Sequence, residues 1–201
     1  MANRMNQNRV VGLLGFCVVV NDVAFASALI KRVDKGVNVD RKRVYSTGFS
    51  NGSVLTWKLG CELRDQIAAI APVAAYLPDS GKCASVNRPL SVAITAGTGD
   101  TIIGWDGVLE GEPRKFFLKP TIRDVIARVR AADACPEPPV VSVGAQIISE
   151  VASDCSKGSG VEMYAVRGLD HRWPGGLPNT VAQHGIDTTA NNWRFLSAHT
   201  L

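Results

Sequence analysis

The chain contains 201 residues, of which 46% are hydrophobic and 20% charged, and its formal net charge is +4 at pH 7. This length fits one globular domain with a single substantial core, and the apolar and charged fractions are ordinary for a soluble protein. The densest basic cluster, Arg41-Lys42-Arg43, has no second basic run or interleaved aromatic residues, so we expect no nucleic-acid partner. We also expect no integral membrane span, because no apolar stretch is long enough.

A segment near the N-terminus has the form of a secretory signal peptide. Arg4 and Arg9 precede the apolar run from Val10 to Val20, and Ala24-Phe25-Ala26 is similar to a small-residue cleavage site. This interpretation would place the protein outside the cytosol.

The same region also fits an amphipathic helix over residues 21–33. Asn21 or Asp22 would cap this helix. Its apolar face would consist of Val23, Ala26, Leu29, Ile30 and Val33. We favour the helix, because cleavage after Ala26 would remove the first turn of this helix.

Beyond residue 40, apolar runs alternate with helical patterns. We expect strands at 44–47, 67–74, 90–96 and 161–166, a hairpin within 140–151, and helices at 54–63, 121–131 and 188–199. This alternation predicts an α/β fold with a mostly parallel sheet and flanking helices. Residues 1–20 are then an ambiguous apolar segment, and residues 21–201 form a single domain. In such sheets, active groups gather beyond the carboxyl ends of the strands.

The most informative stretch is Gly48-Phe49-Ser50-Asn51-Gly52, which has the pattern G-x-S-x-G between an expected strand and an expected helix. In that context the pattern predicts a nucleophile elbow, a sharp turn that exposes the serine hydroxyl. Gly48 and Gly52 would each avoid a collision of Cβ with the neighbouring strand and helix. Without the flanking elements, a turn with a capping serine would be the preferred interpretation.

Three polar residues each follow an expected strand: Ser50, Asp100 and His171. A serine hydroxyl needs an imidazole to accept its proton, and the imidazole needs a carboxylate to fix its tautomer. The order Ser, Asp, His is that of α/β-hydrolases. Taken singly, Asp100 would be a loop cap and His171 a polar loop residue, but their joint placement favours a triad.

Four other titratable residues compete for these roles. Asp106 lies farther from its strand end, and Asp170 adjoins His171 too closely in sequence to meet its ring edge-on. His184 and His199 lie in a loop and in the C-terminal helix, where solvated roles suffice for both.

The five cysteines are Cys17, Cys61, Cys83, Cys135 and Cys155. None has C-x-x-C spacing, so we expect no zinc site and no other metal. Buried free thiols in a cytosolic protein, or two disulfides and one odd cysteine in a secreted protein, both fit. Cys135 and Cys155 flank a β-like stretch that could fold back on itself, which suits a bridge; Cys61 with Cys83 is a weaker pairing.

Three segments together resemble one known family. They are the elbow, Gly97-Thr98-Gly99-Asp100, and the segment from Gly168 to Gly176 that contains His-Arg-Trp-Pro-Gly. They resemble the polyhydroxybutyrate depolymerase-like esterases, which include feruloyl and acetylxylan esterases of carbohydrate esterase family 1. The resemblance runs from about residue 21 to the C-terminus. It implies an α/β-hydrolase fold, serine esterase activity, a secreted or periplasmic location and a disulfide with the spacing of Cys135 and Cys155.

The chain departs from this family near its N-terminus. Family members have a longer N-terminal part with the first strands of the sheet and a His-Gly loop, which supplies one oxyanion-hole donor. Here only residues 1–20 precede the matching helix and the histidine is absent. We therefore expect the N-terminal part of the sheet to be incomplete. Gly104 and Trp105 also stand where the family often has proline and tyrosine.

These observations predict a serine carboxylic-ester hydrolase that works through an acyl-enzyme. Ser50 is the expected nucleophile, His171 the proton shuttle and Asp100 the carboxylate that orients the imidazole. No cofactor is expected.

The binding residues follow from their positions in the sequence, and the substrate class follows from the same resemblance. The Asn51 backbone N–H is the expected oxyanion donor, and Trp105 and Trp173 are expected to bind substrate. The expected substrate is a small ester, a polyester such as a polyhydroxyalkanoate, or a feruloyl or acetyl ester of a polysaccharide. The alternative is a truncated hydrolase-like protein that binds esters with little or no turnover. The oligomeric state is not predicted.

Overall fold

The computed structural model describes residues 9–11, 17–19, 21–76, 88–105, 121–177 and 180–201. The chain forms two compact units, Met1–Val39 and Asp40–Leu201, and each is described by itself. Among the helices in the described ranges, none is long and apolar enough to cross a membrane.

The first unit contains a short strand pair and one helix. Strand β1 (Arg9–Val11) pairs antiparallel with β2 (Cys17–Val19), and helix α1 (Asp22–Asp34) follows. The expected amphipathic helix is therefore present. Of its two candidate caps, Asn21 is the one used, since its side chain accepts a hydrogen bond of 3.0 Å from the Ala24 backbone N–H.

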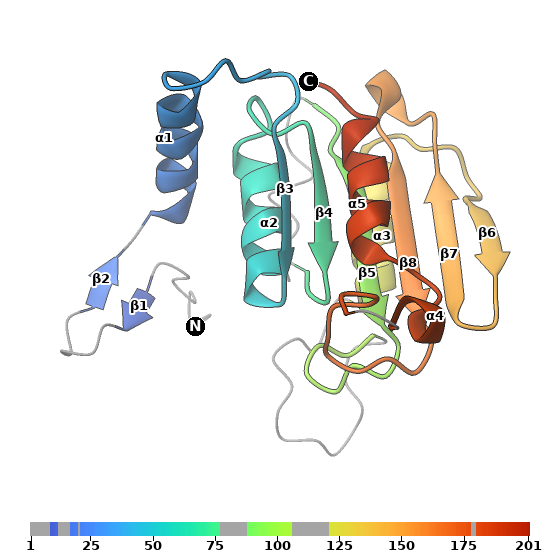
Figure 1. Cartoon of the computed structure of the whole chain (residues 1–201). Coiled ribbons are helices and arrows are strands. Elements are labelled where there is room, and N and C mark those ends of the chain that lie inside the picture. The colour runs from blue at the N-terminus through green and yellow to red at the C-terminus, as the bar shows by residue number, and fades with distance from the viewer. Residues whose placement is uncertain (1–8, 12–16, 20, 77–87, 106–120, 178–179) are drawn as a thin grey trace, which may run out of the picture. The chain divides into compact units, whose positions relative to one another are not determined.

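The second unit is built on a six-stranded sheet in the order β3-β4-β5-β8-β7-β6 (Figure 1). Its strands are β3 (Tyr45–Phe49), β4 (Ala69–Val73), β5 (Ser91–Gly97), β6 (Val140–Val143), β7 (Ile147–Ala152) and β8 (Val161–Val166). The first three and β8 run parallel, whereas β6 and β7 form an antiparallel hairpin at one edge. The expected α/β fold, its mostly parallel sheet and its hairpin are confirmed.

Helices cover both faces of this sheet (Figure 1). They are α2 (Asn51–Glu62), α3 (Ile122–Ala132) and α5 (Thr188–Ser197). The short helix α4 (Thr180–His184) lies at the end toward which the parallel strands point, and a 3-10 turn spans Ser156–Gly158. Successive strand residues face opposite sides. In β4, Ala69 and Ala71 pack in one cluster with Phe195 of α5, whereas Ile70 lies against Gly60 of α2. Every residue of β4 and β5 is buried, as their continuous apolar runs predict.

Local signals in the sequence explain where two of the helices begin. Thr121 Oγ1 accepts a hydrogen bond of 3.1 Å from the Asp124 N–H, and Asp124 Oδ2 accepts one of 2.9 Å from the Thr121 N–H. This capping box starts α3 as expected. Asp187 caps α5 by accepting from the Ala190 N–H at 2.9 Å. The sequence did not predict α4, because five residues are too few to display a helical period.

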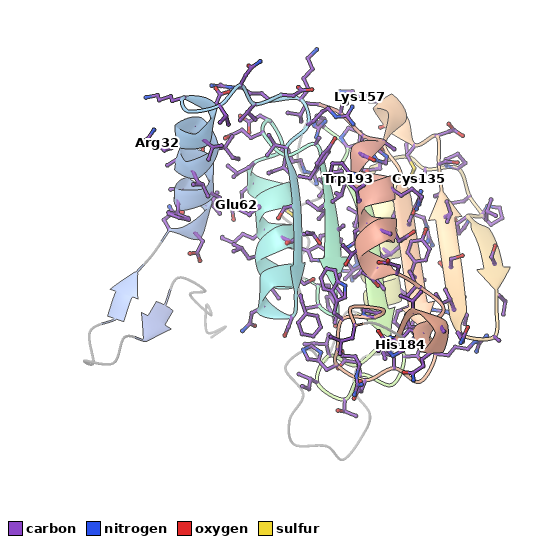
Figure 2. All side chains as sticks on the ribbon, viewed as in Figure 1. Arg32, Glu62, Cys135, Lys157, His184 and Trp193 are labelled. Atoms are coloured by element: carbon purple, nitrogen blue, oxygen red, sulfur yellow. A yellow bond between two sulfur atoms is a disulfide. The ribbon has the colours of Figure 1, made fainter. Side chains whose placement is uncertain are left out.

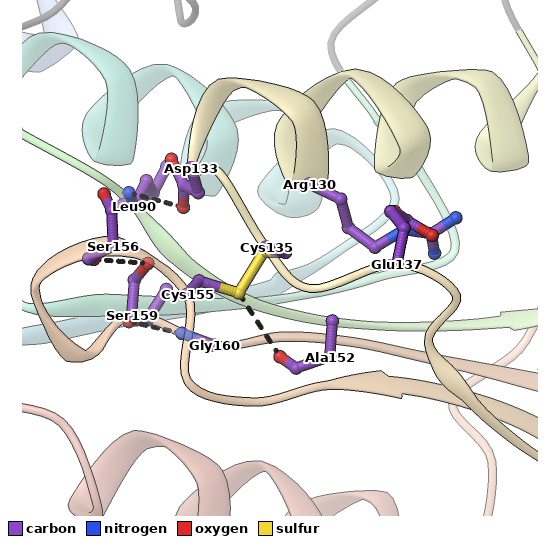
Figure 3. Close-up of a disulfide and its surroundings, with 11 residues drawn as sticks. Leu90, Arg130, Asp133, Cys135, Glu137, Ala152, Cys155, Ser156, Ser159 and Gly160 are labelled. Carbon is purple, nitrogen blue, oxygen red and sulfur yellow. Dashed lines mark hydrogen bonds and ion pairs between the residues drawn. A yellow bond between two sulfur atoms is a disulfide. The ribbon is translucent and has the colours of Figure 1, made fainter.

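A disulfide joins Cys135, which follows α3, to Cys155, which precedes β8 (Figure 3). It closes the segment that contains the β6–β7 hairpin, and it confirms the pairing expected from the sequence. Cys61 is also disulfide-bonded, whereas Cys83 lies outside the described residues. The interpretation of all five cysteines as free thiols is therefore wrong.

Near this bridge, Asp133 ties the end of α3 to the start of β5 (Figure 3). Its Oδ2 accepts a hydrogen bond of 3.0 Å from the Leu90 backbone N–H. Burial raises the pKa of Asp133 to about 6, against the opposing effects of this hydrogen bond and of the nearby Arg64 and Arg88. A carboxyl group that is costly to ionise thus fastens the amino end of β5, away from the carboxyl ends where polar residues were expected to gather.

Replacing Cys135 and Cys155 together with serine is expected to lower the free energy of unfolding. The bridge restricts a loop of 20 residues in the unfolded chain, which is worth about 3 kcal/mol. Urea unfolding of the oxidised protein and of the double variant measures the difference. A loss below about 1 kcal/mol, or two free thiols in mass spectra of unreduced peptides, would contradict a stabilising bridge.

Candidate active site

Ser50 lies at the turn between β3 and α2 in a backbone conformation that few residues adopt. Its φ is 54° and its ψ is −119°, a strained combination that costs a residue with a side chain about 1–3 kcal/mol. Its N–H donates to the Val73 carbonyl at 3.0 Å, and its carbonyl accepts from the Val54 N–H at 3.1 Å. Its side chain makes no capping hydrogen bond to α2. The interpretation as a turn with a capping serine is therefore wrong, and the hydroxyl points elsewhere.

The two glycines of the elbow pattern differ in their structural roles. A Cβ at Gly48 would lie 2.4 Å from the Gly52 carbonyl oxygen, so only glycine fits there. A Cβ at Gly52 would meet nothing within 4 Å. The expectation for Gly48 is confirmed and that for Gly52 is wrong: the backbone of Gly52 is the obstacle that requires glycine at position 48.

His171 contacts both Ser50 and Asp100. Its Nε2 lies 2.8 Å from Ser50 Oγ, and its Nδ1 lies 2.7 Å from Asp100 Oδ2. A carboxylate can only accept, so Nδ1 carries the proton and Nε2 accepts from the serine hydroxyl. Asp100 is 4% exposed, and its Oδ1 accepts from the N–H groups of Ile102 and Ile103, each at 2.8 Å. The imidazole therefore lies between a hydroxyl donor and a fixed carboxylate.

The loops that carry Asp100 and His171 are joined through their backbones. The Thr98 N–H donates to the Val166 carbonyl at 2.9 Å, and the Gly168 N–H donates to Thr98 Oγ1 at 2.8 Å. A Cβ at Gly97 would lie 2.1 Å from the Leu169 carbonyl oxygen. Only glycine permits this approach. The Gly-Thr-Gly-Asp segment thus sets the distance between the carboxylate and the imidazole.

Phe49 is a site residue that the sequence did not reveal. Its ring centroid lies 4.8 Å from that of His171, with the two planes tilted by 39°. The available signal was its position immediately before the serine, at the end of β3. Its contact restricts the rotation of the imidazole on a side where no hydrogen bond holds it.

Of the two rival carboxylates, Asp170 does not take the place of Asp100. Asp170 is exposed and forms hydrogen bonds to Arg172, which lower the pKa of its carboxyl group. Asp106 lies outside the described residues. Within the described ranges, no three His, Cys, Asp or Glu side chains are grouped so that they could hold a metal ion.

The three expected binding residues differ in exposure. Asn51 is the exposed first residue of α2. Trp105 is 6% exposed, with the Arg123 guanidinium 5.8 Å from its ring centroid, so its ring is largely covered. Trp173 is half-buried, and its ring lies against Gly176 in the loop that follows His171.

His184 does not have the solvated role expected from the sequence. It is buried at the end of α4, and its Nδ1 accepts a hydrogen bond of 2.9 Å from the Gly175 N–H. Figure 2 shows it at the end of the sheet toward which the parallel strands point. His199 is half-buried, and its Nδ1–H donates to the Phe195 carbonyl at 2.8 Å. Sequence position alone did not distinguish these bonded rings from solvated ones.

Comparison with known proteins finds esterases. No known family profile matches the chain. Feruloyl esterase B of Piromyces equi is 36% identical over 109 residues, which cover 50% of this chain and 20% of that protein. The protein NocK of Nocardia uniformis subsp. tsuyamanensis, which carries the name of an esterase, is 29% identical over 170 residues, covering 77% and 49%. The chain thus spans about half or less of the length of these curated relatives.

A solved structure gives the same fold. The crystal structure of a thermostable esterase aligns with a TM-score of 0.50 at 10% identity, covering 91% of this chain and 38% of that one. This likeness supports the α/β-hydrolase fold alone. These two sequence relatives have esterase names, which support the esterase part of the expected resemblance.

Alanine at Gly48 and at Gly52 should have opposite effects. Gly48→Ala is expected to cost about 3 kcal/mol of stability or more, because its Cβ would collide with backbone. Gly52→Ala serves as the matched control and should be neutral or stabilising by up to about 1 kcal/mol, since its Cβ meets nothing and alanine favours a helix. Urea unfolding of the two variants measures both. Equal stability losses would contradict this description of the turn.

Proposed function

We propose that the chain is a serine carboxylic-ester hydrolase with Ser50 as nucleophile, His171 as general base and acid, and Asp100 as the orienting carboxylate. One observation carries the proposal: His171 lies 2.8 Å from Ser50 Oγ and 2.7 Å from Asp100 Oδ2. The esterase names of the sequence relatives support the same class of reaction. A half-buried serine at a strained turn, with this imidazole beside it, is suited to acyl transfer.

In the acylation half-reaction, His171 Nε2 takes the proton of Ser50 while Oγ bonds to the ester carbonyl carbon. The carbonyl π electrons move to oxygen and give a tetrahedral oxyanion. The oxyanion then collapses and the C–O bond to the alcohol breaks. The alkoxide leaving group receives the proton from His171 and departs as the alcohol. Asp100 stabilises the imidazolium that exists between the two proton transfers.

Deacylation repeats these steps with water. His171 takes a proton from a water molecule as its oxygen bonds to the acyl carbon, and a second oxyanion forms. Its collapse breaks the bond to Ser50 Oγ, which regains a proton from His171. The products are the carboxylic acid and the free serine, so all atoms and protons balance.

The oxyanion would be stabilised by the backbone N–H of Asn51. Asn51 is the first residue of the twelve-residue helix α2, and the first N–H groups of a helix have no acceptor within it. The positive end of the helix dipole adds to this effect. The residue after the nucleophile is the usual donor in hydrolases with this turn.

We propose that the substrates are polysaccharides esterified with aromatic or acetyl groups. Polyesters are a second substrate type that the same chemistry would hydrolyse. Feruloyl esterase B is a named relative, and the half-buried ring of Trp173 lies in the loop after His171. An aromatic plane there is suited to contact with an aryl or sugar group. The Cys135–Cys155 bridge supports an oxidising compartment as the working location.

Turnover of p-nitrophenyl acetate by the purified chain tests the proposed function. Asp100→Asn should lower kcat by about 10,000-fold, because the imidazole loses its orienting anion. The matched control is Asp170→Asn, which removes an exposed carboxylate next to His171 in sequence and should leave kcat within about twofold. Activity of the wild type that does not exceed that of Ser50→Ala would instead indicate a hydrolase-like binding protein.

Trp173→Ala tests the substrate class. Loss of a stacking contact worth about 1 kcal/mol should raise KM for feruloyl esters about fivefold and leave KM for acetate esters unchanged. The melting temperature should change little, because the ring is only half-buried. Equal effects on both esters together with a loss of several kcal/mol of stability would make the ring structural.

A further inference from the structure

The loop that carries His171 is held at two points along the chain. At its start, the Gly168 N–H donates to Thr98 Oγ1 at 2.8 Å, and the Leu169 carbonyl accepts from the Gly99 N–H at 3.0 Å. Beyond the histidine, the Gly175 N–H donates to His184 Nδ1 at 2.9 Å. The imidazole of His171 thus projects from a short span between two fixed points.

The second fixed point is tightly fitted. Gly175 has φ +66°, and a Cβ there would lie 2.0 Å from the Ile186 carbonyl oxygen, so the loop backbone presses on the chain that follows α4. In that position the Gly175 N–H needs an acceptor, since an unsatisfied amide with restricted access to water is costly. His184, which is 9% exposed, supplies that acceptor from inside the fold.

The backbone on either side of His184 is held by contacts with the sheet and its turns. Gln146, in the turn between β6 and β7, donates from Nε2 to the Ala182 carbonyl at 2.7 Å and to the Gln183 carbonyl at 3.2 Å. These two carbonyls belong to the residues of α4 that directly precede His184, the last residue of the helix. Beyond it, Ile186 packs in a cluster with Val166 and Leu169, which flank the start of the histidine loop. The acceptor is therefore tied to the sheet by contacts on both sides.

We propose that His184 is a positioning residue for the imidazole of His171, acting through the backbone of Gly175; this rests on the proposed ester hydrolysis. Nδ1 must be unprotonated to accept, so Nε2 carries the ring proton. Without this acceptor the loop loses the hydrogen bond that fixes Gly175, whereas its bonds to Thr98 and Gly99 remain. His171 Nε2 then no longer stays at 2.8 Å from Ser50 Oγ. Displacements of this kind at a reacting atom slow the chemical step more than they weaken binding.

Two amide substitutions separate this role from simple filling of space. The side-chain amide of asparagine ends at the δ position, where Nδ1 of histidine lies, so His184→Asn retains an acceptor for Gly175. Glutamine ends one atom farther along, near the position of Nε2, so His184→Gln is polar but misplaces the acceptor. His184→Leu removes it. The matched control is His199→Leu, which removes another bonded ring near Gly160, at the amino end of β8.

Steady-state kinetics with p-nitrophenyl acetate and amide hydrogen exchange give the readouts. We expect His184→Gln and His184→Leu to lower kcat about 10- to 100-fold with KM changed less than about threefold. We also expect faster exchange at Gly175. His184→Asn should keep kcat and exchange close to those of the wild type, and His199→Leu should keep kcat.

The outcomes also separate this inference from the proposed function. Wild-type kcat in His184→Leu, or equal kcat in the Asn and Gln variants, overturns the positioning role while ester hydrolysis stands. If His184→Leu does not fold, the comparison of Asn with Gln decides alone. A wild type no more active than Ser50→Ala overturns the proposed function and this inference with it, whereas unchanged exchange at Gly175 in the Gln variant overturns only the inference.

Discussion

The strained backbone of Ser50 is the constraint on which the candidate site depends. A φ of 54° at a residue with a side chain costs about 1–3 kcal/mol, which other interactions must offset. Hydrogen bonds to Val73 and from Val54 hold the turn, and the absence of a side chain at Gly48 lets the backbone of Gly52 approach. As a result, the Ser50 hydroxyl does not cap α2 and instead contacts the imidazole of His171.

The rest of the site requires that loops far apart in the sequence come into contact. Asp100 and His171 are 71 positions apart, and Ser50 and His171 are 121 apart. Parallel pairing of β5 with β8 brings the first two loops to one end of the sheet. Backbone contacts of Gly97, Thr98 and Gly99 with residues 166–169 then define their spacing within that end. Such contacts tolerate no side chain, which explains the repeated glycine in Gly-Thr-Gly-Asp.

The stabilising features at the amino end of the parallel strands are of another kind. There, the Cys135–Cys155 bridge and the buried Asp133 fasten α3, the hairpin and β5 to one another. A covalent link and a desolvated carboxyl group act on the scaffold as a whole, and neither touches Ser50 or His171. In open parallel sheets the active groups gather at the carboxyl ends of the strands, so these stabilising contacts lie away from the candidate site.

The sequence by itself determined most elements of the six-stranded sheet and its long helices, because periodicity, caps and glycine positions are local signals. The runs that became β4 and β5, the capping box of α3, the hairpin and the serine, aspartate and histidine at strand ends were all predictable in this way. The tertiary structure decided what depends on neighbours distant in the chain. Among these are the choice of Gly48 over Gly52 as the obligatory glycine, the ring of Phe49 on His171, and the buried bond from Gly175 to His184. No local pattern encodes them, since each exists only after two loops or a loop and a helix have met.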